Sequence, residues 1–388
     1  MPTTSSTDPL HIEVYDEVAR AATRDEWDRL AGGVPFRSWD WADCWSRHYR
    51  TAHVRPMVLA VRDVRGQLAG IAPWCISRST LRGKVISFLG SGPVCSDYLS
   101  LLATDDDAPR VATAVAEWLS SAEAEPWDRL HLDGVARDDR AVMALADALH
   151  QRKHIVETHA TMSAWRIELP DTWEQYLEQL SRHRRSRVRK IVRRWFDSGR
   201  CVPRLAETQS DIERGAQVLR DLHQRRRRSL GQSGCFTSPA FAAFHNDAMQ
   251  TLFDARRLRL HWVEFDGCPI AGEYGVIGER VVYAYQSGFD PDYARLKAGW
   301  LNTIASLRLA IEQGFRGYDW MRGDEPYKAS WRGHARGLVE VRVIGSAVGA
   351  RVRHRVLSAG SSARQWLSGP PVMPTIETIN SIVSENFV

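Results

Sequence analysis

Long apolar runs are missing from this chain of 388 residues. Apolar runs such as Val58–Val61 fall far short of the roughly 20 residues needed to cross a bilayer. The first residues, Met1–Leu10, are polar, carry Asp8 and lack the apolar centre of a secretion signal. We therefore expect a cytoplasmic, soluble protein without a membrane span.

Paired cysteines are missing too, because the six cysteines are scattered singly and form no CxxC pair. That spacing suits neither a disulfide framework nor a zinc site. His150 and His154 share helical spacing, but no acidic or third ligand accompanies them, so we expect no metal. The sequence also lacks a GxSxG motif, a P-loop, a Rossmann glycine fingerprint and any signature of cysteine catalysis. What remains is a site that works by positioning and electrostatics, with a phosphate-bearing ligand.

Lysine is scarce: the 52 basic residues include only five lysines. One of them, Lys328, lies in the segment Gly314–Trp331, which we interpret as a helix end, a short strand (Tyr318–Trp320), a Gly-Asp turn and then Tyr327-Lys328. An ammonium and a guanidinium group are not interchangeable at a site. A lysine in an arginine-rich chain therefore suggests chemistry at this position, with a solvated turn residue as the alternative.

Length and composition predict a folded chain of two to three domains, since 44% of the residues are apolar. Two segments share one pattern of strand, tight turn and strand: 57–61 with 68–74, and 258–265 with 270–275. The second turn is Asp266-Gly267, a strong hairpin signal. Two such hairpins about 200 residues apart suggest a duplicated α/β domain.

The second hairpin leads into a further α/β pattern. A β-branched and aromatic strand (281–287) is followed by a loop (288–298), a helix (299–313) that ends at Gly314, and the strand 318–320. This order places a helix N-terminus beside a strand end. Such a position is a common ligand site in α/β folds.

Basic residues concentrate between the two halves, although the net charge is only +5. A capping box at Thr172–Gln175 begins a helical region that leads into the arginine-rich helix 181–195, and a second basic run covers Arg225–Arg228. The basic helix is either a solvated amphipathic helix or a surface for a phosphate-rich partner, namely coenzyme A, a nucleotide-sugar or RNA. The chain after Ser346 has the composition of a tail.

A series of short motifs extends over most of the chain, and their order is specific. They are Phe36-Arg-Ser-Trp-Asp-Trp41 with Trp45, Gly66 to Pro73, Phe88-Leu-Gly90, Asp97-Tyr98, the helix 181–195, Leu222-His223 with Arg225 and Arg226, Phe236, Asp266 to Ala271, Gly299, Gly323-Asp324, Tyr327-Lys328 and Trp331. In this order, from about Phe36 to about Val343, the chain resembles the acetyltransferase family typified by the CelD cellulose-biosynthesis protein, a branch of the GNAT superfamily. It is also similar to the FemABX peptidyltransferases, which carry two GNAT-like domains in one chain.

The resemblance implies an α/β fold with tandem GNAT-like domains, whose mixed central sheets are flanked by helices. It places an N-terminal GNAT-like domain at 1–165, a C-terminal acyltransferase domain at 166–345 and a tail at 346–388. The implied activity is transfer of an acetyl or other acyl group from acyl-CoA, by direct attack of an amine. The implied acceptor is an amine of a sugar, a polysaccharide precursor or a specialised metabolite.

The resemblance also implies a donor site in the second half. Backbone N–H groups of a splayed strand, here 281–287, would hold the thioester carbonyl, and the pyrophosphate would rest at the next helix N-terminus. The residues assigned to donor binding are Tyr283, Tyr285, Gln286, Lys297, Gly299 and Trp331. The loop Ala294–Gly299 has one glycine where the superfamily pattern Arg/Gln-x-x-Gly-x-Gly/Ala has more. Aminoacyl-tRNA, the donor of FemABX proteins, is therefore the alternative, with tRNA as a partner.

Catalytic roles are implied for five residues. Tyr327 would protonate the departing thiolate and Lys328 would stabilise the oxyanion. Glu273 or His223 would accept the proton of the amine, and Asp324 would orient Lys328 or the acceptor. The alternatives are an exposed strand carboxylate for Glu273 and a helix-packing imidazole for His223. A non-catalytic GNAT-like binding protein is the third functional alternative.

Overall fold

The computed structural model describes residues 9–80 and 82–356. The chain divides into two compact units: of the described residues, unit 1 holds 9–162 and 337–356, and unit 2 holds 163–336. Within the predicted tail, residues 348–356 are helical, and 357–388 lie outside the described residues. Among the described helices, none is both long enough and apolar enough to span a membrane.

Unit 1 is built on a mixed sheet with the strand order β1-β2-β3-β4-β6-β13, and β5 pairs with β3. Its strands are β1 (His11–Tyr15), β2 (Val54–Arg62), β3 (Leu68–Ser79), β4 (Gly83–Phe88), β5 (Leu102–Ala103), β6 (Arg129–Ala136), the first part of β7 (Ile155–Glu168) and most of β13 (His334–Ile344). Its helices are α1 (Val18–Ala21), α2 (Arg24–Leu30), α3 (Trp39–Tyr49), α4 (Ala108–Ser120) and α5 (Arg140–Gln151).

Unit 2 has the strand order β7-β12-β11-β10-β9-β8, in which β11 and β12 are parallel and the other pairs are antiparallel. Its strands are the end of β7 (Ile155–Glu168), β8 (Cys201–Leu205), β9 (Leu258–Phe265), β10 (Cys268–Ile277), β11 (Val281–Phe289) and β12 (Gly317–Arg322). Its helices are α6 (Trp173–Gln179), α7 (Arg182–Ile191), α8 (Gln209–Ser229), α9 (Pro239–Asp254), α10 (Ala298–Glu312) and α11 (Tyr327–Ser330).

Both predicted hairpins form, as β2–β3 and β9–β10. In the second turn Asp266 and Gly267 have φ values of 48° and 83°. Two successive positive φ angles match the right-handed twist of the flanking strands, which is why an Asp-Gly pair favours this turn. The predicted strand 281–287, helix 299–313 and strand 318–320 correspond to β11, α10 and β12.

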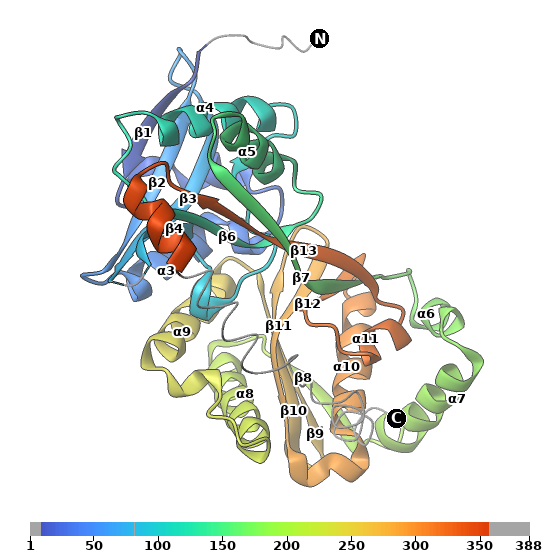
Figure 1. Ribbon diagram of the computed structural model, residues 1–388. Coiled ribbons are helices and arrows are strands. Elements are labelled where there is room, and N and C mark those ends of the chain that lie inside the picture. Colours follow the sequence, from blue (N-terminus) through green and yellow to red (C-terminus); the bar gives the residue numbers. More distant parts are fainter. Residues whose placement is uncertain (1–8, 81, 357–388) are drawn as a thin grey trace. The chain divides into compact units, whose positions relative to one another are not determined.

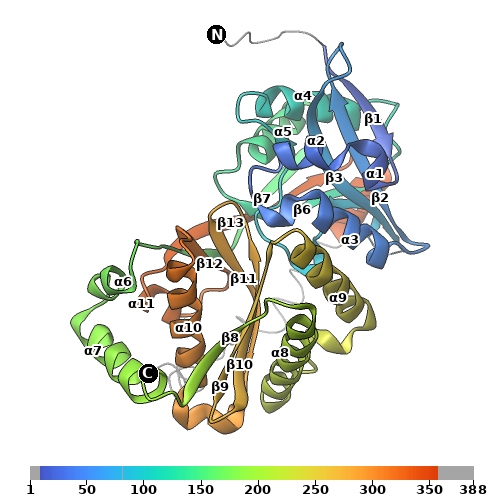
Figure 2. The ribbon, with the colours of Figure 1, turned by 180° about the vertical axis from the view of Figure 1, so that it is seen from behind.

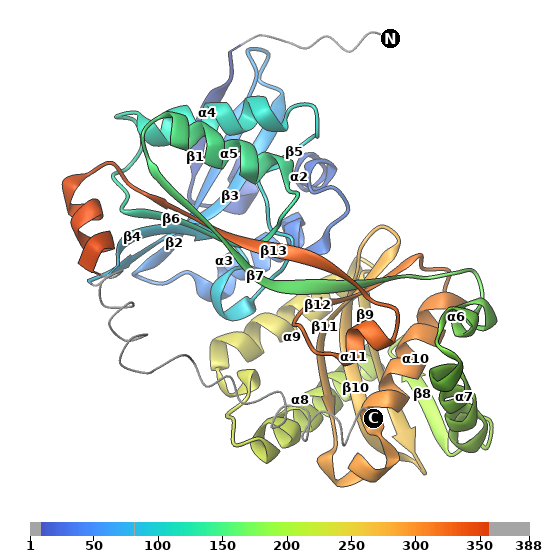
Figure 3. The same cartoon turned by 45° about the vertical axis from the view of Figure 1, so that its right-hand side comes forward.

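Helices cover both faces of the unit 2 sheet (Figures 1 and 2): α8 and α9 lie on one face, and α10 lies on the other with α6 and α7 outside it. The core on the α10 side holds large aromatic side chains, among them Trp300, Tyr318 and Trp331. Figure 3 shows α7 running beside α10. Each helix presents an apolar face to its neighbour because its hydrophobic residues recur every three to four positions.

The basic helix differs from its prediction at one end. The capping box predicted at Thr172 and Gln175 is confirmed and begins α6. The helix predicted over 181–195, however, is regular only to Ile191 and continues as a π-helical turn over Val192–Phe196. A π turn accommodates an extra residue, and here it lets both Val192 and Phe196 pack against the core.

Candidate functional site

β11 and β12 are hydrogen-bonded to each other only at their beginnings. Their parallel ladder joins Val281–Tyr283 to Gly317–Asp319. β11 continues along β10 to Phe289, whereas Arg322 at the end of β12 pairs with β7. Among the described strands, none pairs with the β12-facing edge of β11 beyond Tyr283. The two strands therefore diverge beyond Tyr283.

A β-bulge lies within the diverging part of β11. The register with β10 shifts between Ala284 and Gln286, which makes Tyr285 the extra residue. A bulge changes the direction of side chains and peptide groups along a strand. The hydroxyl of Tyr285 lies 3.2 Å from Nε2 of His245 on α9, and the amide of Gln286 contacts Cys235.

The helix that follows this strand, α10, begins without a side-chain cap. Its N-cap is Lys297, in the left-handed conformation with φ 57° and ψ 54°, and no side chain accepts a hydrogen bond from the first turn. Helices α6 to α9 are each capped by a serine or threonine hydroxyl. A cationic N-cap adds to the positive end of the helix dipole instead of offsetting it. Such a terminus favours an anion such as phosphate.

Two arginines of α7 enlarge this positive region. The guanidinium carbons of Arg184 and Arg187 lie 4.6 and 5.1 Å from the ring centre of Trp300, in the first turn of α10. Nη1 of Arg184 is buried without a hydrogen-bond partner. Burial, followed by the charge of Arg187, lowers the pKa of Arg184 and that of Lys297. These cations therefore repel one another, and a bound anion would relieve the repulsion.

Lys328 is buried, with 3% of its side chain exposed. Its Nζ lies 2.9–3.5 Å from the carbonyl oxygens of four consecutive residues, 320–323, and 2.9 Å from Oε2 of Glu325. The bend in this segment includes Met321 at φ 58°. The ammonium thus fixes the end of β12 where it diverges from β11, and its three hydrogens have protein acceptors. Its role as an oxyanion donor stays a prediction.

Asp324 does not contact Lys328 through any hydrogen bond or ion pair between described residues, contrary to one of its two expected roles. Its carboxylate accepts hydrogen bonds from the backbone N–H of Ser163 and from Nε1 of Trp165, at 3.1–3.3 Å. The carboxylate beside Lys328 belongs to Glu325. Asp324 instead ties the loop after β12 to β7, because donors on that strand face it. Its expected role toward the acceptor stays a prediction.

Tyr327 and Trp331 flank Lys328 on α11 and its end. The ring of Tyr327 packs edge-to-face on Trp320 with centroids 5.9 Å apart, and burial raises the pKa of its hydroxyl. Trp331 is fully buried and contacts Trp300 at a centroid distance of 5.1 Å. The guanidinium carbon of Arg184 lies 5.3 Å from the centre of the Trp331 ring, so this tryptophan packs against the cationic region.

Glu273 lies under α10, at the centre of a buried polar cluster. Only 4% of it is exposed, so the alternative of an exposed strand carboxylate is wrong. Asn302 and Ser306 donate to its carboxylate at 3.1 and 3.2 Å, and the Tyr318 hydroxyl is a further donor. Burial raises its pKa despite these donors and the nearby Arg259. This cluster joins the sheet to α10; the role of Glu273 as a base stays a prediction.

His223 lies on the opposite face of the sheet from Glu273 and is 2% exposed. Its Nδ1 lies 3.2 Å from the carbonyl oxygen of Ser287 on β11, and its Nε2 lies 3.3 Å from Sγ of Cys235. Burial lowers its pKa. The close approach of α8 to β11 brings these groups together: a Cβ added to Gly288 would lie 2.4 Å from the backbone nitrogen of His223.

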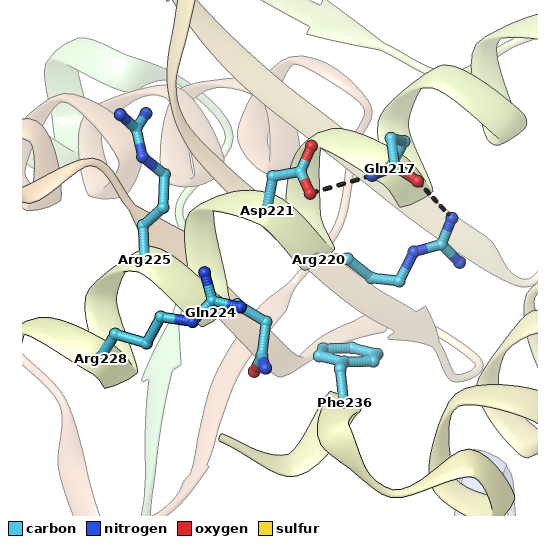
Figure 4. A pocket seen from close by; sticks show the side chains of 7 residues that line it. All are labelled: Gln217, Arg220, Asp221, Gln224, Arg225, Arg228 and Phe236. Atoms are coloured by element: carbon cyan, nitrogen blue, oxygen red, sulfur yellow. Dashed lines mark hydrogen bonds between the residues drawn. The ribbon is translucent and has the colours of Figure 1, made fainter. Parts of the chain in front are cut away.

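A basic pocket of about 460 Å³ lies along α8, the helix that carries His223. Figure 4 shows its lining, six side chains of α8 and one phenylalanine from the turn that follows: Gln217, Arg220, Asp221, Gln224, Arg225, Arg228 and Phe236. Three guanidinium groups and a single carboxylate favour an anionic ligand. Arg225 is also paired with Asp290, at the start of the loop that leads to α10.

The predicted site residues therefore fall into separate groups. Lys297 and Gly299 lie at the α10 terminus. Gln286 and His223 contact Cys235, and Tyr285 contacts His245. Tyr327, Lys328, Asp324 and Trp331 lie at or after the end of β12, Tyr283 is buried where β11 and β12 begin to diverge, and Glu273 lies beneath α10. The sequence reasoning missed Cys235, His245 and the stacking of Arg184 and Arg187. No local motif marks them, because their partners come from other elements.

The chain is similar to known proteins in one family model and in its fold. Residues 182–329 match the family model of the acetyltransferase (GNAT) domain. The chain is similar in structure to a crystal structure of FemX, at 11% identity and a TM-score of 0.60, with 84% of this chain and 96% of that chain covered. It is also similar to a conserved protein of unknown function from Bacteroides thetaiotaomicron, at 12% identity and a TM-score of 0.53, with 86% and 100% covered. No curated protein matches the chain in sequence.

The matched segment contains α7 to α10, β8 to β12 and most of α11, and hence the diverging strands and the cationic helix terminus. The narrower resemblance to CelD stays a prediction. The predicted fold class is confirmed: the chain has a mixed α/β fold with helix-flanked sheets, and residues 182–329 of its second unit match the GNAT domain model.

Proposed function

We propose that this protein is an N-acyltransferase that transfers an acyl group from acyl-CoA to an amine. One observation carries the proposal: in a GNAT domain, the diverging strands β11 and β12 lead directly to an uncapped helix terminus surrounded by Arg184, Arg187 and Lys297. Peptide N–H groups on the stretch of β11 beyond its ladder with β12 suit the carbonyl of a thioester. The cationic terminus suits the pyrophosphate of coenzyme A.

The acceptor in this proposal is an amine of a sugar, a polysaccharide precursor or a specialised metabolite. The α8 pocket, which is lined by the guanidinium groups of Arg220, Arg225 and Arg228, suits an anionic substituent of such a molecule. Tyr327 is the proposed acid for the departing thiolate, and its raised pKa keeps the hydroxyl protonated at neutral pH. Tyr327→Phe is expected to lower kcat without changing the affinity for acetyl-CoA.

Calorimetric titration with acetyl-CoA at low and moderate salt tests the donor. We expect micromolar binding that is lost in Gly299→Glu, because a carboxylate in the first turn of α10 would repel the pyrophosphate. An amine panel with detection of released coenzyme A then tests transfer. Binding without transfer to any amine would favour a non-catalytic GNAT-like protein, and no binding at either salt concentration would contradict acyl-CoA as the donor.

Aminoacyl-tRNA is the second candidate donor, and the basic surface of α7 favours it. The segment 182–194 carries eight lysines and arginines, and among the described residues none of them pairs with a carboxylate. Such a surface suits a long polyanion as well as a single pyrophosphate. Binding of charged tRNA that weakens steeply with salt, together with no binding of acetyl-CoA, would establish this alternative.

A further inference from the structure

A cysteine and a histidine form a close pair beside the diverging strands. Sγ of Cys235 lies 3.3 Å from Nε2 of His223, and Nδ1 of the same ring lies 3.2 Å from the carbonyl oxygen of Ser287. A carbonyl oxygen can only accept a hydrogen bond, so Nδ1 carries the ring hydrogen. Nε2 then presents its lone pair to the thiol. This orientation is the one required of a base that activates a cysteine.

An amide donor completes the arrangement. Nε2 of Gln286 lies 3.5 Å from Sγ of Cys235. Gln286 follows the bulge in β11 and lies beyond Tyr283, where the ladder with β12 ends. A nucleophile, a base fixed by a backbone carbonyl and an N–H donor for an oxyanion therefore meet at the strand to which the proposed function assigns the thioester.

The burial of the two residues suits these roles. His223 is 2% exposed and is held by Ser287 and by the edge of the Phe236 ring, with centroids 5.3 Å apart. Cys235 is less buried than His223, with an intermediate exposure. Burial raises the pKa of the thiol and lowers the pKa of the imidazole, which keeps the resting pair neutral. A neutral pair transfers its proton during the attack, as a serine and histidine do.

We propose that Cys235 accepts the acyl group from the thioester before the amine does. The acyl group would thus pass from coenzyme A to Cys235 and then to the acceptor, in place of the direct attack that the family resemblance implies. The inference rests on the proposed function for its donor.

The two steps balance in atoms and charge. In the first, Sγ of Cys235 attacks the thioester carbonyl carbon while Nε2 of His223 takes the thiol proton, and Gln286 donates to the oxyanion. The bond to the coenzyme A sulfur breaks, and that thiolate takes the proton from His223, which on this two-step route replaces Tyr327 as the acid for the thiolate. In the second, the amine attacks the S-acyl carbonyl, His223 takes the amine proton, and the Cys235 sulfur leaves and regains a proton.

The intact mass of the protein after incubation with acetyl-CoA, without an amine, tests the first step. We expect the mass of one acetyl group to be added, to map to Cys235 and to be removed by neutral hydroxylamine, which cleaves thioesters. Cys235→Ser is expected to lose the modification, and the control Cys268→Ala, at an exposed cysteine, to keep it. His223→Gln is expected to slow acylation about a hundredfold. Thermal unfolding of each variant separates a lost nucleophile from a lost fold.

A second acyl donor distinguishes failure of this inference from failure of the proposed function. p-Nitrophenyl acetate acylates an activated thiol without needing a coenzyme A site. Acetylation of Cys235 by this ester but not by acetyl-CoA would support the nucleophile and contradict the donor. A folded Cys235→Ser variant that acylates amines at the wild-type rate would overturn the inference and leave the proposed function standing. Absence of acetylation by both donors would also overturn it.

Discussion

Helices α7 and α8 of unit 2 are both rich in arginine, yet they use it in opposite ways. On α8, Arg214 pairs with Glu264 at 2.7 Å, and Arg225 pairs with the buried Asp290. On α7 and its π turn, eight basic side chains have no carboxylate partner among the described residues. Two of them stack on tryptophan at the terminus of α10 instead.

The presence or absence of a carboxylate partner distinguishes arginines that stabilise the structure from arginines that we expect to bind a ligand. A paired guanidinium cross-links two elements and offsets the desolvation of its partner. Unpaired cations repel one another and destabilise the fold slightly, unless a partner from outside neutralises them. The paired arginines of α8, Arg214 and Arg225, are therefore expected to affect stability, and Arg184 and Arg187 of α7 to affect binding.

The largest effect is expected from disrupting the packing of α8 itself. Gly288→Ala would place a Cβ 2.4 Å from the backbone nitrogen of His223, and a backbone atom cannot move aside as a side chain can. We expect a loss of about 3 kcal/mol in the free energy of unfolding, measured with urea. The matched control is Gly272→Ala on β10, whose Cβ would lie no closer than 3.5 Å to any neighbour. Equal losses in both variants would contradict the tight contact at Gly288.

The next effect concerns binding at α7. Replacing both Arg184 and Arg187 with alanine removes the two cations nearest to the α10 terminus. We expect the Kd for acetyl-CoA to rise about 30-fold, or about 2 kcal/mol, because charge-assisted contacts to phosphate are lost. The control is the double replacement of Arg185 and Arg189, which stack on no ring of the described residues. A similar loss in the control would indicate a diffuse electrostatic attraction instead of a specific site.

A smaller effect is expected for the paired arginine of α8. Arg225→Ala leaves Asp290 buried without its cation, and Asp290 begins the loop before α10. Because 51% of the Arg225 side chain is exposed, we discount the cost of a buried pair to about 1.5 kcal/mol in the free energy of unfolding. Arg228→Ala, on the same helix, is the control. An unchanged melting temperature for Arg225→Ala would show that water replaces the guanidinium.

The smallest effect is the stability change at Arg185 and Arg189 of α7, which pair with no carboxylate among the described residues. Arg185→Ala and Arg189→Ala are each expected to change the free energy of unfolding by less than about 0.5 kcal/mol, because no partner is lost and some repulsion is relieved. Chemical denaturation at low salt measures this change. A loss as large as that of Arg225→Ala would mean that α7 uses these arginines for structure, and the contrast between the helices would disappear.

Much of the fold could be predicted because its signals are local. Asp266 and Gly267 specify a turn through their own backbone preferences, and the capping box at Thr172 begins a helix through contacts within one turn. The π-helical turn at Val192–Phe196 was not predicted, since it results from packing against two other elements.

The candidate site was predicted only in part. Its strand and helix terminus follow from the order of elements, and the family resemblance points to the same segments. The burial of Glu273 depends on α10 covering that face of β10, which no pattern around residue 273 reveals. Likewise Cys235 and His223 meet only because α8 contacts β11 at Gly288 and the chain after α8 turns back.

By itself, the sequence determined the hairpins, the helices, the basic segment 182–194 and the place of a helix terminus after a strand. Hydrophobic periodicity, turn-forming residues and the order of charges act over a few residues, so they can be recognised in the sequence alone. The tertiary structure alone decided which arginines are paired, that Lys328 holds the end of β12, and that a thiol faces an imidazole. Those outcomes depend on distances between elements far apart in sequence, which only the packing of helices on a sheet can set.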